Sequence, residues 1–350
     1  MPTQGIVEAL DRYDAWLAGH CEVIPAELAR KRRMMASDPF VLLRGTAFRY
    51  AARFAAAEPA LTAALRVPSC GDAHIENFGT WRDAEGRLVW GVNDLDEAAM
   101  LPWTADLLRL AASALLARQG KAPRAREVAA TILEGYCGKL AAPCAFVLDA
   151  RHAALRAFVA PAGPARAKFW AMIEGLREAT PPAAFDAALR EALPPGASGI
   201  RFAPRTAGVG SLGRPRFVCA AEWGGSPVAR EAKARVPSAW IEAGFPGALG
   251  VDALAFPPPG RVPDPWFRQS ATLSVRRLAP DSRKLEAPEG EPAALLQVLG
   301  AMAAELANLH AAGGAVAAVA AEAKALPRDW LREAAKREAA ANARDAEALR

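Results

Sequence analysis

Histidine and cysteine are scarce in this sequence, and neither residue forms a recognisable metal-binding or disulfide pattern. Only four of the 350 residues are histidine and five are cysteine, and no two cysteines form a CxxC pair. An odd cysteine count without pairing motifs is typical of a reduced protein, so we expect a cytoplasmic location. The scarcity of histidine disfavours hydrolytic sites in which several histidines surround two metal ions.

We expect no cleavable leader, and the sequence has no long uninterrupted hydrophobic run. The segment MPTQGIVEALDRYDAW carries acids early and lacks a basic region followed by an apolar core, so it does not predict a signal peptide. The most apolar stretch, 299–320, is mainly alanine and is interrupted by Glu305, Asn308 and His310. We therefore expect no membrane span and no membrane partner.

Charge is only slightly unbalanced, and no basic block is interleaved with aromatic residues. The chain has 43 Lys and Arg against 38 Asp and Glu, which gives a formal net charge of +5. This pattern disfavours nucleic-acid binding, so we expect no nucleic-acid partner. Small anionic ligands fit the same charge.

The length of the chain and the change in its residue pattern from helix-like to strand-like predict two lobes of an α+β protein. Helical periodicity dominates to about residue 193, strand-like runs follow the Pro- and Gly-rich stretch 193–205, and helices resume at Glu291. We expect a helical catalytic lobe at 1–195, a β-rich lobe at 196–285, and helices at 286–350 that pack back on the first lobe. The tail from Arg328 is expected to be an exposed helix.

Turn and capping residues predict several local features. Asp38 before Pro39 predicts a turn in ASDPF, and Asp83 and Gly86 in WRDAEG predict a hairpin turn. Gly224-Gly225 predicts a turn between two strand-like runs. Thr104 is expected to cap a helix that runs to about Gly120.

Two acidic segments, CGDAHIENFG at 70–79 and NDLDE at 93–97, contain most of the candidate chemistry. Acids at this density are costly to bury unless they meet a metal, a phosphate or each other. The D-x-x-x-x-N spacing of Asp72 and Asn77 fits a phosphoryl-transfer loop, with a catalytic base and a magnesium ligand. Asp94, or less favourably Asp96, would supply a second metal-binding carboxylate. We expect His74 to brace the loop through hydrogen bonds.

A glycine-rich segment, GVGSLG at 208–213, stands between two strand-like runs. The dinucleotide and P-loop patterns both fail, because no helix or Lys-Ser/Thr pair follows the last glycine. A strand-loop-strand context favours a loop that covers nucleotide phosphates. The covering residues would be Gly208, Gly210, Ser211 and Gly213. Lys233 on the next strand would contact the phosphates, held by Glu242 or Glu231.

The segments resemble those of a kinase-like phosphotransferase when they are read from Gly208 to the end of the chain and then from its start. The glycine-rich segment then comes first and the two acidic segments last, as in a kinase-like chain that was cut once and rejoined. LANLH at 306–310 is similar to a helix that precedes the catalytic loop in aminoglycoside phosphotransferases, and CGDAHIEN resembles their HGDLHPGN. The resemblance implies a circularly permuted, two-lobed kinase-like fold. It also implies Asp72 as base, Asn77 and Asp94 as metal ligands with Asp96 auxiliary, and Asp106 as a structural anchor.

The chain also resembles a bacterial family of uncharacterised function. The shared motifs include LLRG at 42–45, CGDAHIENFG, NDLDEA, TADLLRLAAS, AGVGSLG, VRRL and LANLHAAGG. Departures from the kinase-like pattern occur at Cys70, Leu95 and Ala234. Since that family has no assigned activity, the resemblance implies a fold rather than a substrate.

We therefore expect transfer from ATP, with magnesium, to an unidentified small-molecule or protein acceptor, assisted by Arg44 or Arg276. A nucleotide-binding protein without turnover, or one that transfers an adenylyl group, is the first alternative. A metal-dependent phosphoesterase is the next. The patterns identify neither the acceptor nor the oligomeric state.

Overall fold

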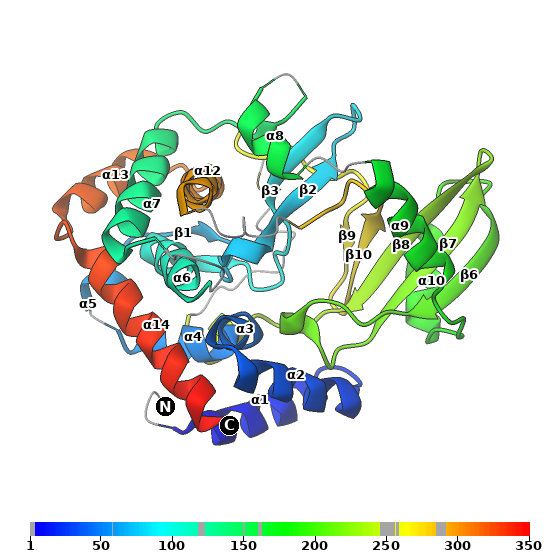
Figure 1. Cartoon of the computed structure of the whole chain (residues 1–350), viewed down its shortest axis with the longest axis horizontal. Coiled ribbons are helices and arrows are strands. Elements are labelled where there is room, and N and C mark those ends of the chain that lie inside the picture. Colours follow the sequence, from blue (N-terminus) through cyan, green and yellow to red (C-terminus); the bar gives the residue numbers. More distant parts are fainter. Residues whose placement is uncertain are drawn as a thin grey trace.

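The computed structural model of this chain describes residues 4–57, 59–117, 123–149, 151–159, 163–245, 256, 259–284 and 292–350. It is a mixed helix and sheet structure, so the predicted α+β class is confirmed. A helical body with two small sheets lies beside a five-stranded sheet (Figure 1). The expected boundary at 285 and 286 lies outside the described residues.

Five helices precede the first strand: α1 (Ile6–Ala18), α2 (Pro25–Ser37), α3 (Pro39–Gly45), α4 (Ala47–Ala55) and α5 (Pro59–Thr62). The expected turn before Pro39 is present, because the Asp38 carboxylate accepts the backbone N–H of Phe40 at 2.7 Å and caps α3. Ile6 and Leu10 of α1 pack in one apolar cluster with Ala346 near the end of the chain. The first and last helices therefore lie together.

Two small antiparallel sheets form in the helical body. One pairs β1 (Arg66–Ser69) with β4 (Ala99–Pro102), and the other has the order β2 (Phe78–Arg82), β3 (Leu88–Val92), β5 (Phe146–Val147). In the β2–β3 turn the Asp83 carboxylate accepts the N–H groups of Glu85 and Arg87, and Gly86 has a φ of +73°. The hairpin predicted from the WRDAEG turn is therefore confirmed.

The core of the body is built from α6 (Trp103–Leu116), α7 (Ala125–Leu140), α12 (Pro292–Ala311), α13 (Val316–Ala325) and α14 (Trp330–Ala348). The expected capping of α6 by Thr104 is wrong, because its hydroxyl donates to the carbonyl of Leu61 at 2.8 Å. The expected exposure of the final helix is also wrong. Leu331 of α14 is fully buried, and Glu338 pairs with Arg53 of α4.

The β-rich lobe is one antiparallel sheet of order β6 (Ser198–Pro204), β7 (Arg216–Trp223), β8 (Ser226–Ala234), β10 (Leu273–Leu278), β9 (Arg268–Gln269). Gly224 and Gly225 adopt positive φ in the β7–β8 turn, as the sequence predicts. The lobe also carries α9 (Gly163–Glu174) and α10 (Ala183–Glu191), whereas α8 (Ala153–Val159) packs on the core of the helical body through Leu155 and Val159. Leu189 of α10 packs on one face of the sheet, and Ile173 of α9 packs on the other.

Among the described residues, one helical segment, Ala293–Ala311 of α12, is long and apolar enough to cross a membrane by length and composition. Sixty-seven per cent of its apolar window is buried inside the protein. Core helices of this kind meet the same criteria, so the segment is weak support for a membrane span.

Glu305 of α12 is an ionisable group in the core that carries a prediction. Its carboxylate faces Arg261 Nη1 at 3.4 Å and Asn308 Nδ2 at 3.1 Å, and a Cβ at Gly91 would lie 2.2 Å from its Oε1. Burial raises the pKa of Glu305 from 4.5 to about 7, although Arg261 opposes the rise. The folded state therefore retains a proton that the unfolded chain releases near pH 4.5.

This contribution to stability should be lost as the pH rises from 4.5 to 7, by roughly 3 kcal/mol. We expect the melting temperature of wild type, relative to that of Glu305→Gln, to fall between pH 5 and pH 8. Thermal unfolding at both pH values, with exposed Glu347→Gln as control, measures the change. A difference that stays constant with pH would contradict the assignment.

Candidate functional site

The loop from Cys70 to Asn77 follows β1 and ends in the short helix η1 (Ile75–Asn77). The first turn of α6 holds this loop. The Asp106 carboxylate accepts the backbone N–H groups of Cys70 at 2.8 Å and Gly71 at 3.0 Å. Gly71 has a φ of +75°, and a Cβ there would lie 2.0 Å from the carbonyl oxygen of Glu97. Asp106 therefore lies where the kinase-like resemblance implies an anchor.

Asn77 joins the two acidic segments. Its amide nitrogen donates to the carbonyl oxygens of Asp72 and Asp94, both at 3.0 Å, and its amide oxygen accepts the N–H of Asp94 at 3.0 Å. The residue is 2% exposed. The predicted magnesium ligand thus uses both N–H groups as a brace, which leaves one lone pair of its oxygen for a ligand.

The Asp72 carboxylate, the predicted base, is paired with a buried arginine. Arg109, 1% exposed, donates from Nε and Nη2 to Asp72 Oδ1. Burial raises the pKa of Asp72, and Arg109 opposes that rise. The described residues leave Asp72 Oδ2 without a hydrogen bond, so this oxygen is available to a reacting hydroxyl.

His74 does not brace the loop in the way the sequence suggests. Its Nε2 lies 3.9 Å from Asp72 Oδ2, too far for a hydrogen bond, and its Nδ1 is buried without a partner in the described chain. Burial, together with Arg44 and Arg109, lowers the pKa of His74 well below its usual value. The imidazole is therefore neutral at physiological pH.

Asp94 and Asp96, which follow β3, contact Lys233 of β8. The Lys233 Nζ atom lies 3.0 Å from Asp94 Oδ2 and 2.6 Å from Asp96 Oδ2, and Arg214 Nη1 lies 3.0 Å from the same Asp96 oxygen. Burial raises the pKa of Asp94, but Lys233 and Lys284 outweigh burial and hold this pKa well below its usual range. Both carboxylates are therefore drawn into ion pairs between the lobes.

The prediction that Glu242 or Glu231 holds Lys233 is wrong. Glu242, in α11 (Ala239–Glu242), is exposed, and Glu231 pairs with arginines instead. Lys233 itself lines a small cavity of about 20 Å³ beside Asp94 and Asp96, rather than the cavity of about 350 Å³ between the lobes. A lysine contact with phosphates would require Lys233 to exchange its present partners.

Glu231 lies at the centre of a cluster of three arginines from different parts of the β-rich lobe. Its Oε1 accepts Arg216 Nη1 at 2.5 Å and Arg276 Nε at 2.9 Å, and its Oε2 pairs with Arg205. Burial raises the pKa of Glu231, but the three guanidinium groups outweigh burial and lower it strongly. The cluster keeps an excess of two positive charges beside the glycine-rich segment.

The glycine-rich segment connects β6 to β7, so the predicted strand-loop-strand context is confirmed. Val209–Ser211 form a single turn of 3₁₀ helix, and Ser211 Oγ accepts Arg216 Nη2 at 2.6 Å. Gly208, Gly210 and Ser211 line the cavity between the lobes. Gly208 has a φ of +74°, which a side-chain-bearing residue adopts only with strain.

Gly213 is not on the cavity wall, because this end of the segment docks on α2. Its N–H donates to Glu27 Oε2 at 3.0 Å, and a Cβ at Gly213 would lie 2.2 Å from Leu28 Cδ2. Buried Lys31 donates to the carbonyl of Gly210 at 3.1 Å. These contacts tie the glycine-rich segment to the helical body.

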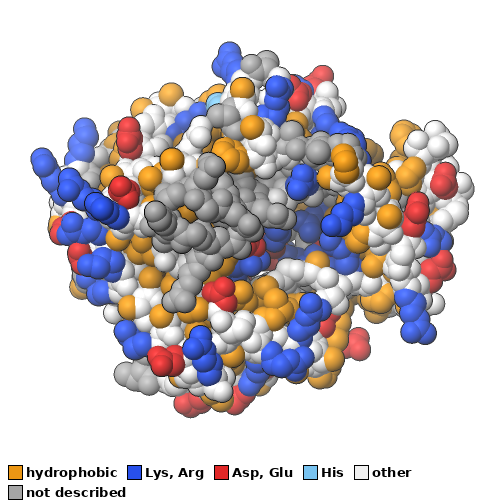
Figure 2. Space-filling model, in the orientation of Figure 1, with side chains coloured by type: hydrophobic (Ala, Val, Ile, Leu, Met, Phe, Trp, Pro, Cys, Tyr) orange, Lys and Arg blue, Asp and Glu red, His pale blue; other side chains and the backbone are white. Residues whose placement is uncertain are grey.

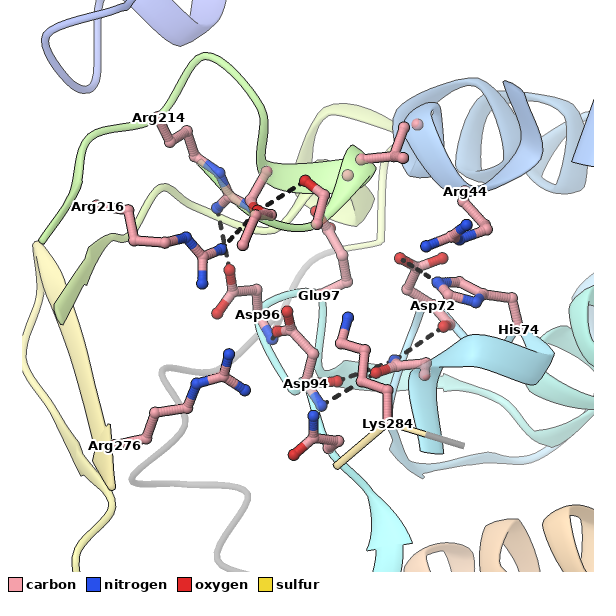
Figure 3. A pocket seen from close by; sticks show the side chains of 18 of the residues that line it. Arg44, Asp72, His74, Asp94, Asp96, Glu97, Arg214, Arg216, Arg276 and Lys284 are labelled. Atoms are coloured by element: carbon pink, nitrogen blue, oxygen red, sulfur yellow. Dashed lines mark hydrogen bonds and ion pairs between the residues drawn. The ribbon is translucent and has the colours of Figure 1, made fainter. Parts of the chain in front are cut away.

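The two lobes enclose a cavity of about 350 Å³, a size typical of small-molecule sites. Lys and Arg side chains border this hollow (Figure 2), and Figure 3 shows its charged groups pointing inward. Six cations and four acids line it: Arg44, Arg205, Arg214, Arg216, Arg276, Lys284, Asp72, Asp94, Asp96 and Glu97. The excess of positive charge suits an anionic ligand.

Three groups at this site were not found from the sequence. Arg109 lies three residues after Asp106 on α6, a helical spacing that would have placed both on the loop side. Lys284 reaches the cavity because its backbone bridges Gly79 of β2, and no local pattern signals such a contact. Burial and the charge of Asp72 raise the pKa of Glu97 to about 7.

No three His, Cys, Asp or Glu side chains in the described ranges gather closely enough to hold a metal by themselves. Magnesium commonly uses one or two carboxylates together with substrate phosphates. Asp94, whose side chain is 36% exposed, and the free lone pair of Asn77 fit that incomplete donor set. The described residues offer no comparable set of ligands for the two metal ions of a hydrolase site.

Part of the chain is similar to a known family. Residues 23–143 match a family model described as an uncharacterized protein conserved in bacteria (DUF2252). The match spans both acidic segments and α6 but not the β-rich lobe. No curated protein and no solved structure matches this chain.

Proposed function

We propose that this protein is an ATP- and magnesium-dependent phosphotransferase of circularly permuted, kinase-like architecture. The observation that carries the proposal is the convergence of the glycine-rich segment and both acidic segments on one cavity with a cationic lining. A phosphoryl-transfer site needs a phosphate cover, metal-binding oxygen atoms and a base, and these three elements face each other here.

Described residues can fill each of these roles. Asp72 Oδ2 would accept the proton of the attacking hydroxyl. Asp94 and Asn77, with Asp96 auxiliary, would hold magnesium, which would neutralise charge on the phosphates when ATP is bound. Gly208, Gly210 and Ser211 would cover the phosphates, with Arg216 and Arg276 on the same wall; Gly213 would support the segment through α2.

The position of α12 supports the permuted order. His310, at the end of LANLH, lies with Nε2 3.3 Å from the Asp106 oxygen that holds Cys70. A Cβ at Gly313 would lie 2.8 Å from Pro68 of β1. The helix therefore ends beside the strand that enters the acidic loop, as it would in an unpermuted kinase-like chain.

Calorimetric titration with the non-hydrolysable analogue AMP-PNP, with and without magnesium, tests the proposal. Magnesium should tighten binding, and Asp94→Asn and Lys233→Ala should each weaken it at least tenfold. The first variant removes a metal ligand, and the second removes the lysine that would exchange from Asp94 and Asp96 to the phosphates. Exposed Asp329→Asn and Lys336→Ala are matched controls. Absence of binding under every condition would refute the proposal.

A second candidate is nucleotide binding without transfer. The ion pair of Asp72 with Arg109 favours it, because the guanidinium opposes the rise in pKa that burial gives Asp72 and so makes this carboxylate a weaker base than it would be without Arg109. Incubation with ATP labelled at the γ- or α-phosphate separates the candidates. Label released or transferred from the γ-position supports phosphotransfer, and label transferred from the α-position supports adenylyl transfer. Binding without either supports a nucleotide-binding module.

A further inference from the structure

Three polar groups around Asp72 form no hydrogen bond within the described chain, and all three residues line the cavity. They are Arg44 Nε and His74 Nδ1, both buried, and the ammonium of Lys284. His74 Nδ1 is a donor when the neutral ring carries its proton there. Buried donors of this kind are rare unless a ligand or water completes them. Figure 3 shows the three side chains gathered near the Asp72 carboxylate.

Contacts position Arg44 and Lys284, and burial in the acidic loop positions His74, which is 6% exposed. Arg44, in the last turn of α3, pairs through Nη2 with Glu76 at 2.6 Å, which leaves Nε free. Lys284 is positioned by the backbone bridge to Gly79. Burial lowers the pKa of Lys284 to about 8, and the Asp94 carboxylate opposes that fall.

These donors lie on the opposite side of the acids from the arginine cluster around Glu231. Arg205, Arg216 and Arg276 belong to the β-rich lobe with the glycine-rich segment, whereas Arg44 and His74 belong to the helical body. The nucleotide phosphates already have cations on the β-rich wall. A second group of donors beside the base is therefore suited to a second anion.

We propose that Arg44, His74 and Lys284 form an anion subsite for the acceptor, which is a small hydroxyl compound bearing a phosphate or carboxylate group. The acceptor role rests on the proposed phosphotransferase function. Binding the anion would bring the acceptor hydroxyl to Asp72. The hydroxyl oxygen then bonds to the γ-phosphorus, its proton passes to Asp72 Oδ2, and the bridging β–γ P–O bond breaks with its electron pair leaving on ADP.

Calorimetric titration with inorganic phosphate tests the subsite on both nucleotide-free protein and protein saturated with AMP-PNP and magnesium. Phosphate should bind in both states. Lys284→Gln and Arg44→Gln should each weaken phosphate binding at least tenfold. Arg44→Gln should also leave AMP-PNP affinity within about twofold, because Arg44 pairs with Glu76 rather than with the metal-binding acids. Lys336→Gln is the control, melting temperatures report folding, and parallel titrations with acetate distinguish carboxylate from phosphate recognition.

Each result decides between the subsite and the proposed function. Competition between phosphate and AMP-PNP, with both variants weakening the nucleotide, would assign these residues to the γ-phosphate and overturn the subsite. AMP-PNP binding without phosphate or acetate binding would also overturn it while leaving the proposed function in place. Anion binding lost in the variants, in a protein that never binds AMP-PNP, would retain the subsite and remove the phosphotransferase.

Discussion

Replacing Asp72 with asparagine is expected to lower ATP turnover about 10²- to 10⁴-fold, the range that a positioned general base typically contributes. The amide cannot accept the proton of the attacking hydroxyl, whereas the phosphate-covering segment and the metal-binding oxygen atoms are unchanged. AMP-PNP affinity should therefore stay within about threefold of wild type. Release of ADP from magnesium ATP, with water as the acceptor, measures turnover.

A folding defect must be separated from a chemical one, because Asp72→Asn leaves the Arg109 guanidinium buried without its counter-ion. Breaking a buried ion pair costs up to about 3–5 kcal/mol. The double variant Asp72→Asn, Arg109→Met removes both charges and should regain stability while remaining inactive. Asp329→Asn, a change of an exposed acid, is the matched control. Asp72→Asn with wild-type turnover would disprove the assignment of the base.

Glu231→Gln is expected to destabilise the β-rich lobe by about 3–5 kcal/mol, since it removes the carboxylate that pairs with three arginines in a buried cluster. Glutamine keeps an acceptor for one guanidinium but no charge. The lobe should therefore unfold at a lower temperature than in wild type, and thermal or urea unfolding followed by tryptophan fluorescence measures the loss.

Anions should partly reverse this loss, because phosphate or sulfate near Arg216 and Arg276 would replace the missing negative charge. The control is Glu222→Gln on β7, whose side chain is exposed. If the melting temperature of Glu231→Gln fell no further than that of Glu222→Gln, the arginine cluster would not depend on its carboxylate. A fall that anions did not reverse would show that the arginines are not accessible to ligands.

The local elements of this fold could be predicted because their causes are local. Asp38 before Pro39 caps a helix, and Asp83 and Gly86 close a hairpin, through contacts within four residues along the chain. Periodicity likewise separates the helical body from the antiparallel sheet. The acidic loop and the glycine-rich segment were found for the same reason, since spacing and turn residues determine both.

The tertiary structure alone decided which charges meet. Asp94 and Lys233 are 139 residues apart and pair because β8 brings its lysine against the loop after β3. The many charged residues of α14 suggested an exposed helix. Tertiary packing buries part of it, because some of these charged residues find partners on α4. The sequence by itself determined the elements and the candidate chemistry, whereas ion pairing and burial depend on long-range contacts that short-range patterns do not encode.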